Sequence, residues 1–198
     1  MRPLEPFLRA TNVHLAFRRS DLTVQHSSDR KNRFLLISFA VLAMDQWSKW
    51  WIEHNLAPYD RIEVIPGLFN LIFAKNTGIA FGLFPSRGEF LGTAILALLG
   101  LAALTLVSLL FARTPSSQTT LLLALSLVLG GAVGNLADRL MLGAVTDFLD
   151  VYNGSRHFPT FNVADSSITV GIVFLAWDSV FGGASATSEL DSGSEAGA

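Results

Sequence analysis

Two long uncharged runs constrain this chain more than any other feature. Residues 90–112 contain no charged side chain, and as a helix they would extend about 34 Å, since each residue adds about 1.5 Å. A second uncharged run covers residues 114–137, and its polar start TPSSQTT indicates a turn, so a span is expected over 120–138. About 20 apolar residues suffice to cross a bilayer. With 51% hydrophobic and 15% charged residues, the sequence predicts a membrane protein.

Two further apolar runs complete a predicted set of four spans. The first covers residues 34–52 and ends in tryptophans that are typical of an interfacial belt. The other covers residues 163–181. Between the first two spans, residues 53–88 contain short apolar or alternating segments bounded by proline and glycine, which predict at least two strands. The expected fold is an all-α membrane protein with four transmembrane helices and a small extracytoplasmic β element.

The two ends of the chain differ in charge. Residues 1–33 carry seven basic and three acidic side chains and are interpreted as a mostly disordered leader, with a short amphipathic helix over residues 7–17 as the alternative. Residues 182–198 are small, polar and acidic, which predicts a disordered tail. The basic leader, together with Arg113 between the second and third spans, places both termini in the cytoplasm. The domain over residues 34–181 then has its two long loops outside.

Composition excludes several classes of function. A net charge of only -2, without a basic patch, argues against a nucleic-acid partner. The absence of cysteine excludes disulfides, thiol nucleophiles and thiolate metal sites. The four histidines lack paired ligand spacing, which argues against a zinc protease. No metal or organic cofactor is expected.

The predicted topology gathers the rare polar residues into one layer near the outer surface. Residues spaced i, i+3 or i+4 on a helix share a face, so each span presents one polar edge. Polar groups beside membrane-length segments carry a high desolvation cost and indicate function. The residues are Asp45 and Lys49 in the first span, Asn135, Asp138 and Arg139 at the end of the third, Asp147 in the loop that follows, and Asn162 and Asp165 at the start of the fourth.

Two carboxylates close together favour acid–base hydrolysis of a peptide bond, because repulsion between them keeps one protonated while the other activates water. From the residues alone, Asp138 and Asp147 rank equally as candidates. Asn162 and Asp165 could instead cap the fourth helix, and Asp147 could be a solvated turn residue. A proton or ion transporter and a non-enzymatic scaffold remain alternatives to an enzyme. Asp150 and Asp178 are interpreted as surface groups.

Five sequence blocks occur in a specific order along the chain. They are DQWSK (45–49), NTGIAFG (76–82), GNLADR (134–139), VTDFLD (145–150) and FNVAD (161–165). In this order they resemble the lipoprotein signal peptidases, or signal peptidase II, over about residues 34–181. The resemblance implies an aspartyl endopeptidase of the bacterial inner membrane. Such an enzyme cuts prolipoproteins before a cysteine that carries diacylglycerol, near the periplasmic face.

The resemblance also assigns roles to residues. It implies that Asp147 and Asp165 are catalytic, that the β element is a surface cradle, and that the loop after Arg139 lies over the substrate. It implies prolipoprotein and membrane lipid as partners, and a monomer is expected. The residues implied to support the site or bind substrate are Asp45, Lys49, Asn76, Asn135, Asp138, Arg139 and Asn162. The long leader and acidic tail depart from the family's usual pattern, and Thr146 stands where the family often has an apolar residue, with little effect expected.

Overall fold

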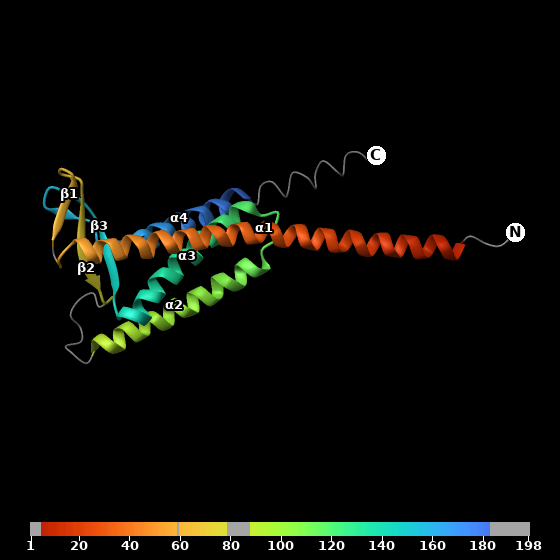
Figure 1. The fold of residues 1–198 in the computed structure, drawn as a ribbon. Coiled ribbons are helices and arrows are strands. Elements are labelled where there is room, and N and C mark those ends of the chain that lie inside the picture. Colours follow the sequence, from red (N-terminus) through yellow and green to blue (C-terminus); the bar gives the residue numbers. More distant parts are fainter. Residues whose placement is uncertain (1–4, 59, 79–87, 183–198) are drawn as a thin grey trace.

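The computed structural model describes residues 5–58, 60–78 and 88–182, and of residues 5–29, 88–91 and 182 it describes the backbone alone. In this part of the chain, four long helices lie side by side with a small sheet at one end (Figure 1). The predicted helical runs are all confirmed as helices. The elements are α1 (Glu5–Asn55), α2 (Gly88–Arg113), α3 (Thr119–Leu142) and α4 (Val163–Trp177), which continues into a π-helical turn, η1 (Asp178–Gly182).

Three of these segments are long and apolar enough to cross a membrane: Gly92–Arg113, Thr119–Leu142 and Val163–Phe181. Large apolar side chains such as Leu98 and Val173 are exposed on them. So much exposed apolar surface is stable in lipid but would be costly in water. Helix α1 is less apolar because Asp45, Gln46 and Lys49 interrupt its apolar run. The architecture therefore fits a membrane protein with a β cradle.

The N-terminal region differs from the sequence expectation. Instead of a mostly disordered leader, α1 begins at Glu5 and continues without a break to Asn55, so its first half extends beyond the other helices (Figure 1). Within these bounds the sequence has no glycine, and its one proline, Pro6, lies in the first turn, where a missing N–H removes no helical hydrogen bond. Nothing in this segment therefore interrupts the helix. The predicted tail lies beyond Gly182, outside the described residues.

Helix α3 packs against each of the other three helices. Its glycines allow this, since a Cβ on Gly130 would lie 2.6 Å from the Ser38 carbonyl of α1, and one on Gly131 would lie 2.5 Å from the Ala164 carbonyl of α4. Such distances are shorter than real Cβ contacts. Small residues thus bring the backbones of α1, α3 and α4 close together.

The sheet has four antiparallel strands in the order β1–β2–β3–β4: β1 (Arg61–Ile65), β2 (Phe69–Asn76), β3 (Val145–Asn153) and β4 (Arg156–His157). The first two confirm the predicted strands. The turn between them has Pro66 followed by Gly67 at φ 78°, and the Leu68 N–H donates to the Ile65 carbonyl, as in a type II turn. The last two strands occupy the region that was expected to be a loop.

An apolar cluster joins the sheet to the end of α1. Ile52 of α1 and Leu56, which follows the helix, pack with Phe148 of β3, and all three are buried. Partly buried residues from β2 and the start of α4 surround them. The cluster therefore holds strand β3 against the end of α1 and the start of α4.

Candidate active site

Asp147 lies on strand β3, where the sequence had suggested a loop. Helix α3 ends at Leu142, and the capping residue Gly143, whose φ of 72° suits a glycine, turns the chain into β3. Asp147 pairs with Ala74 of β2 and is only 1% exposed, so the solvated-turn interpretation is wrong. Its Oδ1 accepts a hydrogen bond from Asn162 Nδ2 (2.8 Å), and its Oδ2 accepts one from Asn76 Nδ2 (2.8 Å).

Asp165 lies in the first turn of α4. The Asn162 side chain accepts a hydrogen bond from the Asp165 N–H (2.9 Å), and Asp165 Oδ2 accepts one from the Asn162 N–H (3.2 Å). These reciprocal bonds form a capping box, so the capping role that the sequence had offered as an alternative is present. The second oxygen of Asp165, Oδ1, accepts a hydrogen bond from Asn135 Nδ2 of α3 (2.7 Å). Capping therefore leaves this carboxylate oriented toward the centre of the polar layer.

Two asparagines connect the carboxylates. Asn162 contacts both Asp147 and Asp165, and its Nδ2 also donates to Asn135 Oδ1 (3.2 Å). Asn162 is fully buried and Asn135 is 7% exposed. The structure thus brings together Asp147, Asp165, Asn76, Asn135 and Asn162 from one helix end, one helix start and two strands.

Behind this group lies a buried charged cluster, which we call the Lys49 cluster. Lys49 Nζ lies 2.7 Å from Asp45 Oδ2 and 2.7 Å from Asp138 Oδ2, and it donates to Asn135 Oδ1 (3.0 Å). Because Lys49 neutralises Asp138, the structure does not favour Asp138 as the partner of Asp165. The second oxygen of Asp45, Oδ1, accepts a hydrogen bond from the Ala164 N–H in the first turn of α4 (2.9 Å). The cluster therefore links α1 and α3 to the helix start that carries Asp165.

Gln46 is a member of the Lys49 cluster that sequence reasoning missed. Its Nε2 donates to Asp138 Oδ1 (2.9 Å) and to Asp45 Oδ2 (3.2 Å). Adjacent residues on a helix do not face each other, so its position beside Asp45 gave no sign of a shared role. Sequence reasoning also gave no role in the site to Glu53, Lys75 and Thr146. These three residues hydrogen-bond to one another, and Thr146 is next to Asp147 in the chain.

The electrostatic environment distinguishes Asp147. Burial raises the pKa of Asp147 to about 6, and repulsion by Asp165 acts in the same direction, while hydrogen bonds from Asn76 and Asn162 oppose it. A carboxyl that holds its proton near neutral pH can act as an acid in hydrolysis.

The raised pKa of Asp147 predicts a pH dependence of stability. The folded pKa of about 6 exceeds the ordinary value of 3.8, so this group contributes stability that is complete below about pH 4 and is lost as pH rises through 6. Between pH 4 and 7 we expect the unfolding temperature of Asp147→Asn to fall less, or to rise more, than that of the wild type. Thermal unfolding followed by tryptophan fluorescence measures both slopes. Equal slopes in Asp147→Asn and wild type would contradict the prediction.

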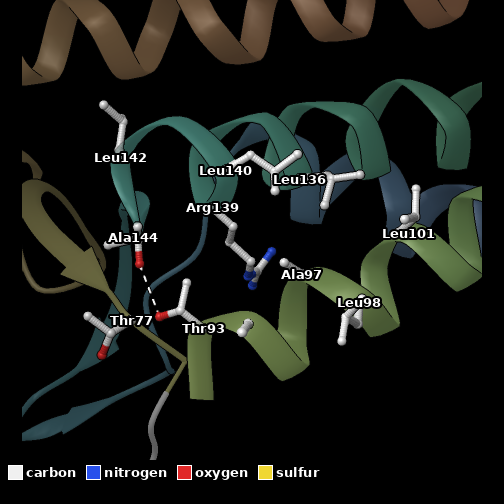
Figure 2. A pocket seen from close by; sticks show the side chains of 12 residues that line it. Thr77, Thr93, Ala97, Leu98, Leu101, Leu136, Arg139, Leu140, Leu142 and Ala144 are labelled. Carbon is white, nitrogen blue, oxygen red and sulfur yellow. Dashed lines mark hydrogen bonds between the residues drawn. The ribbon is translucent and has the colours of Figure 1, made fainter. Parts of the chain in front are cut away.

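A cavity of about 730 Å³ lies between α2 and α3, and its lining includes Thr77 and Ala144, which are next in sequence to the strands that carry Asn76 and Asp147 (Figure 2). Its walls are mostly aliphatic, including Leu98, Leu101 and Leu136. Arg139 extends from α3 toward Ala97 of α2 in Figure 2, and its Nη1 donates to the Asn135 carbonyl (3.2 Å). Arg139 therefore borders both the cavity and the residue that holds Asp165. The buried Nε of Arg139 has no hydrogen-bond partner among the described residues.

The expectation for Asp150 has a clear outcome. Asp150 is 2% exposed and hydrogen-bonds Asn70 (2.8 Å) and His157 (2.7 Å), so its assignment to the surface is wrong. The chain makes a tight turn after Asn76, where Asn76 Oδ1 accepts a hydrogen bond from the Gly78 N–H and Gly78 has a φ of 75°. Ala80 and Phe81, from the same block, lie outside the described residues.

Comparison with known proteins gives consistent matches. A sequence profile described as Signal peptidase (SPase) II matches residues 37–181. A lipoprotein signal peptidase of Pseudomonas syringae pv. tomato is 41% identical over 159 residues, which are 80% of this chain and 91% of the relative. One of Sulfurihydrogenibium is 43% identical over 149 residues, which are 73% of this chain and 90% of the relative. A solved structure described as a bacterial membrane enzyme at 1.9 Å resolution has a TM-score of 0.67 and 28% identity, over 76% of this chain and 94% of that one.

Proposed function

The chain belongs to the signal peptidase II family of aspartic peptidases, which remove signal peptides from prolipoproteins, and we propose that Asp147 and Asp165 are its catalytic pair. The observation that carries this assignment is the shared amide of Asn162, which contacts both residues. Each residue has a further asparagine on its other oxygen, Asn76 for Asp147 and Asn135 for Asp165. Both carboxyl groups are therefore held in fixed orientations, as acid–base catalysis requires.

The two carboxyl groups take different roles in this proposal. Asp165 stands at the N-terminus of α4, where the helix dipole favours a negative charge, so it is the base that removes a proton from water. Asp147 carries the proton, because burial raises its pKa and a bound substrate would exclude more water. The resulting hydroxide adds to the scissile carbonyl while Asp147 donates its proton to the carbonyl oxygen. Collapse of this intermediate breaks the C–N bond: the proton on Asp165 passes to the leaving amine, and one hydroxyl of the intermediate returns a proton to Asp147, which restores both carboxyl groups.

The cavity between α2 and α3 supports a lipidated substrate. Its aliphatic walls suit an acyl chain, and the donors of Arg139 suit carbonyl or ester oxygens at its polar end. We propose that the diacylglyceryl group of the substrate cysteine enters this cavity laterally from the membrane, while the bond before that cysteine reaches Asp147 and Asp165. The apolar signal peptide would remain in lipid beside the helices.

In the proposed topology, α1 crosses the membrane together with the three apolar helices α2, α3 and α4, which gives four spans. Asp45 and Lys49, which lower the hydropathy of α1, are buried against α3 and not directed toward lipid, so they do not prevent α1 from spanning. The basic leader and Arg113 support a cytoplasmic position for both termini, which places the sheet and the active site at the periplasmic face of the inner membrane. A monomer suffices, because all the proposed site residues come from one chain.

The experiment that tests this function is a gel-shift cleavage assay with purified protein in detergent. The substrate is a prolipoprotein prepared with and without the diacylglyceryl group. We expect cleavage of the lipidated form alone, with the modified cysteine as the new N-terminus, and no visible product with Asp147→Asn in the time that the wild type needs for complete cleavage. Equal cleavage of both forms would refute lipid recognition, and no cleavage by folded wild-type protein would refute the activity.

A further inference from the structure

Thr146 is fully buried in strand β3, next to Asp147. Its Oγ1 donates a hydrogen bond to Glu53 Oε1 (2.5 Å) and accepts one from Lys75 Nζ (2.9 Å). Lys75 also donates to the same Glu53 oxygen. We call these three residues the Thr146 clamp. They come from the end of α1, from β2 and from β3, so the clamp ties the strand of Asp147 to a helix and to its neighbouring strand.

Side chains along strand β3 alternate between its two faces, and this alternation places Thr146 and Asp147 on opposite faces. Successive side chains on a strand point to opposite faces. Thr146 and Phe148 both face the end of α1, where Thr146 meets Glu53 and Phe148 packs with Ile52. Asp147, between them, faces Asn162. One polar and one apolar anchor therefore hold the strand from one side while the carboxylate is presented on the other.

The backbone of Thr146 also contacts Asn162, the residue that Asp147 faces. Its carbonyl accepts a hydrogen bond from Asn162 Nδ2 (3.4 Å), the same nitrogen that donates to Asp147 Oδ1. A displacement of Thr146 would thus move both Asp147 and the asparagine that orients it. Misplacement of a reacting group by about 1 Å can cost on the order of 10²-fold in rate.

From this arrangement we propose that Thr146, Glu53 and Lys75 are positioning residues that set the Asp147 carboxyl for hydrolysis. The proposal rests on the catalytic role proposed above for Asp147. Glu53 and Lys75 are partly exposed, with side chains 26% and 39% accessible, so their ion pair alone adds little stability. Their hydrogen bonds to the buried hydroxyl instead give the clamp a fixed geometry.

The matched variants are Thr146→Val and Thr146→Ser. Valine keeps the β-branched shape that suits a strand and loses the hydroxyl, whereas serine keeps the hydroxyl. We expect Thr146→Val to lower kcat for the lipidated substrate about tenfold, with KM within about twofold of the wild-type value. Thr146→Ser, which keeps the hydroxyl, should have a kcat within about threefold of the wild-type value. Thr114→Val, a buried threonine at the other end of the bundle whose Oγ1 donates to the Leu110 carbonyl, should leave kcat unchanged.

A second variant addresses the same contact from α1. Glu53→Met removes the acceptor and should also lower kcat about tenfold, and the double variant Glu53→Met/Thr146→Val should be no slower than either single variant, because both remove one interaction. Wild-type kcat in Thr146→Val or in Glu53→Met would overturn the proposal, as would multiplicative losses in the double variant. Asp147→Asn is measured in parallel. Full activity of Asp147→Asn would refute the catalytic role itself, whereas an inactive Asp147→Asn with an unaffected Thr146→Val would refute the clamp alone.

Discussion

Asp147→Asn and Asp165→Asn are each expected to lower the rate of signal-peptide cleavage by about 10² to 10⁴-fold, because an amide can neither remove a proton from water nor supply one to the carbonyl. Both variants should remain folded. Asparagine has nearly the shape of aspartate, and at position 165 it keeps an acceptor for the Asn162 N–H. Single-turnover cleavage of the lipidated prolipoprotein, with unfolding temperature measured on the same samples, separates loss of chemistry from loss of structure.

The pair should also behave as one unit. The double variant is expected to be no slower than the slower single variant, since either change already removes the mechanism. Asp150→Asn is the matched control, because Asp150 is a buried carboxylate on the same strand that contacts Asn70 and His157 and neither member of the pair. Rapid cleavage by a folded single variant, or an Asp150→Asn enzyme as slow as Asp147→Asn, would refute the assignment.

The largest effect on stability is expected for Lys49→Met. Lys49 is 4% exposed and is the cation between Asp45 and Asp138, which are 0% and 3% exposed. Its removal leaves two buried carboxylates without a counter-charge, and breaking a buried ion pair in this way costs about 3–5 kcal/mol. Denaturation in detergent micelles, followed by tryptophan fluorescence, should show this loss in the free energy of unfolding.

Two comparisons identify the cause of this loss. Lys75→Met removes a partly exposed ion pair with Glu53 and should cost no more than about 1 kcal/mol. If the uncompensated charges cause the loss, replacing Asp45 and Asp138 with asparagine in the Lys49→Met background should recover most of the stability. A Lys49→Met protein as stable as Lys75→Met would show that the Lys49 cluster contributes no such stabilisation.

Sequence reasoning was most accurate where contacts follow from helical spacing. Asp45 and Lys49 are four residues apart on α1 and do form an ion pair, and Asn162 with Asp165 do cap α4. These interactions depend on one turn of one helix, so local periodicity is enough to predict them.

The environment of Asp147 could not be predicted in the same way. Strand β3 pairs with β2, which lies about seventy residues earlier in the chain, and the register of that pairing is set by packing across the sheet. Its sequence VTDFLDVYN has buried polar residues at Thr146, Asp147 and Asp150, so it lacks the alternation of a half-buried strand. A loop was the natural expectation, and the Thr146 clamp, formed from three separate segments, had no local signal at all.

The turn at Gly143 has a consequence for how this protein can vary. Only Ala144 separates that glycine from the start of β3, and from there the alternation of the strand decides which side chains meet α1 and which meet Asn162. One added or deleted residue before Asp147 would exchange the two faces, turning the carboxylate toward Glu53 and the threonine side of the strand toward the asparagines. The length of this connection is therefore as much a part of the active site as the carboxyl groups, and natural variation in chain length must be accommodated elsewhere.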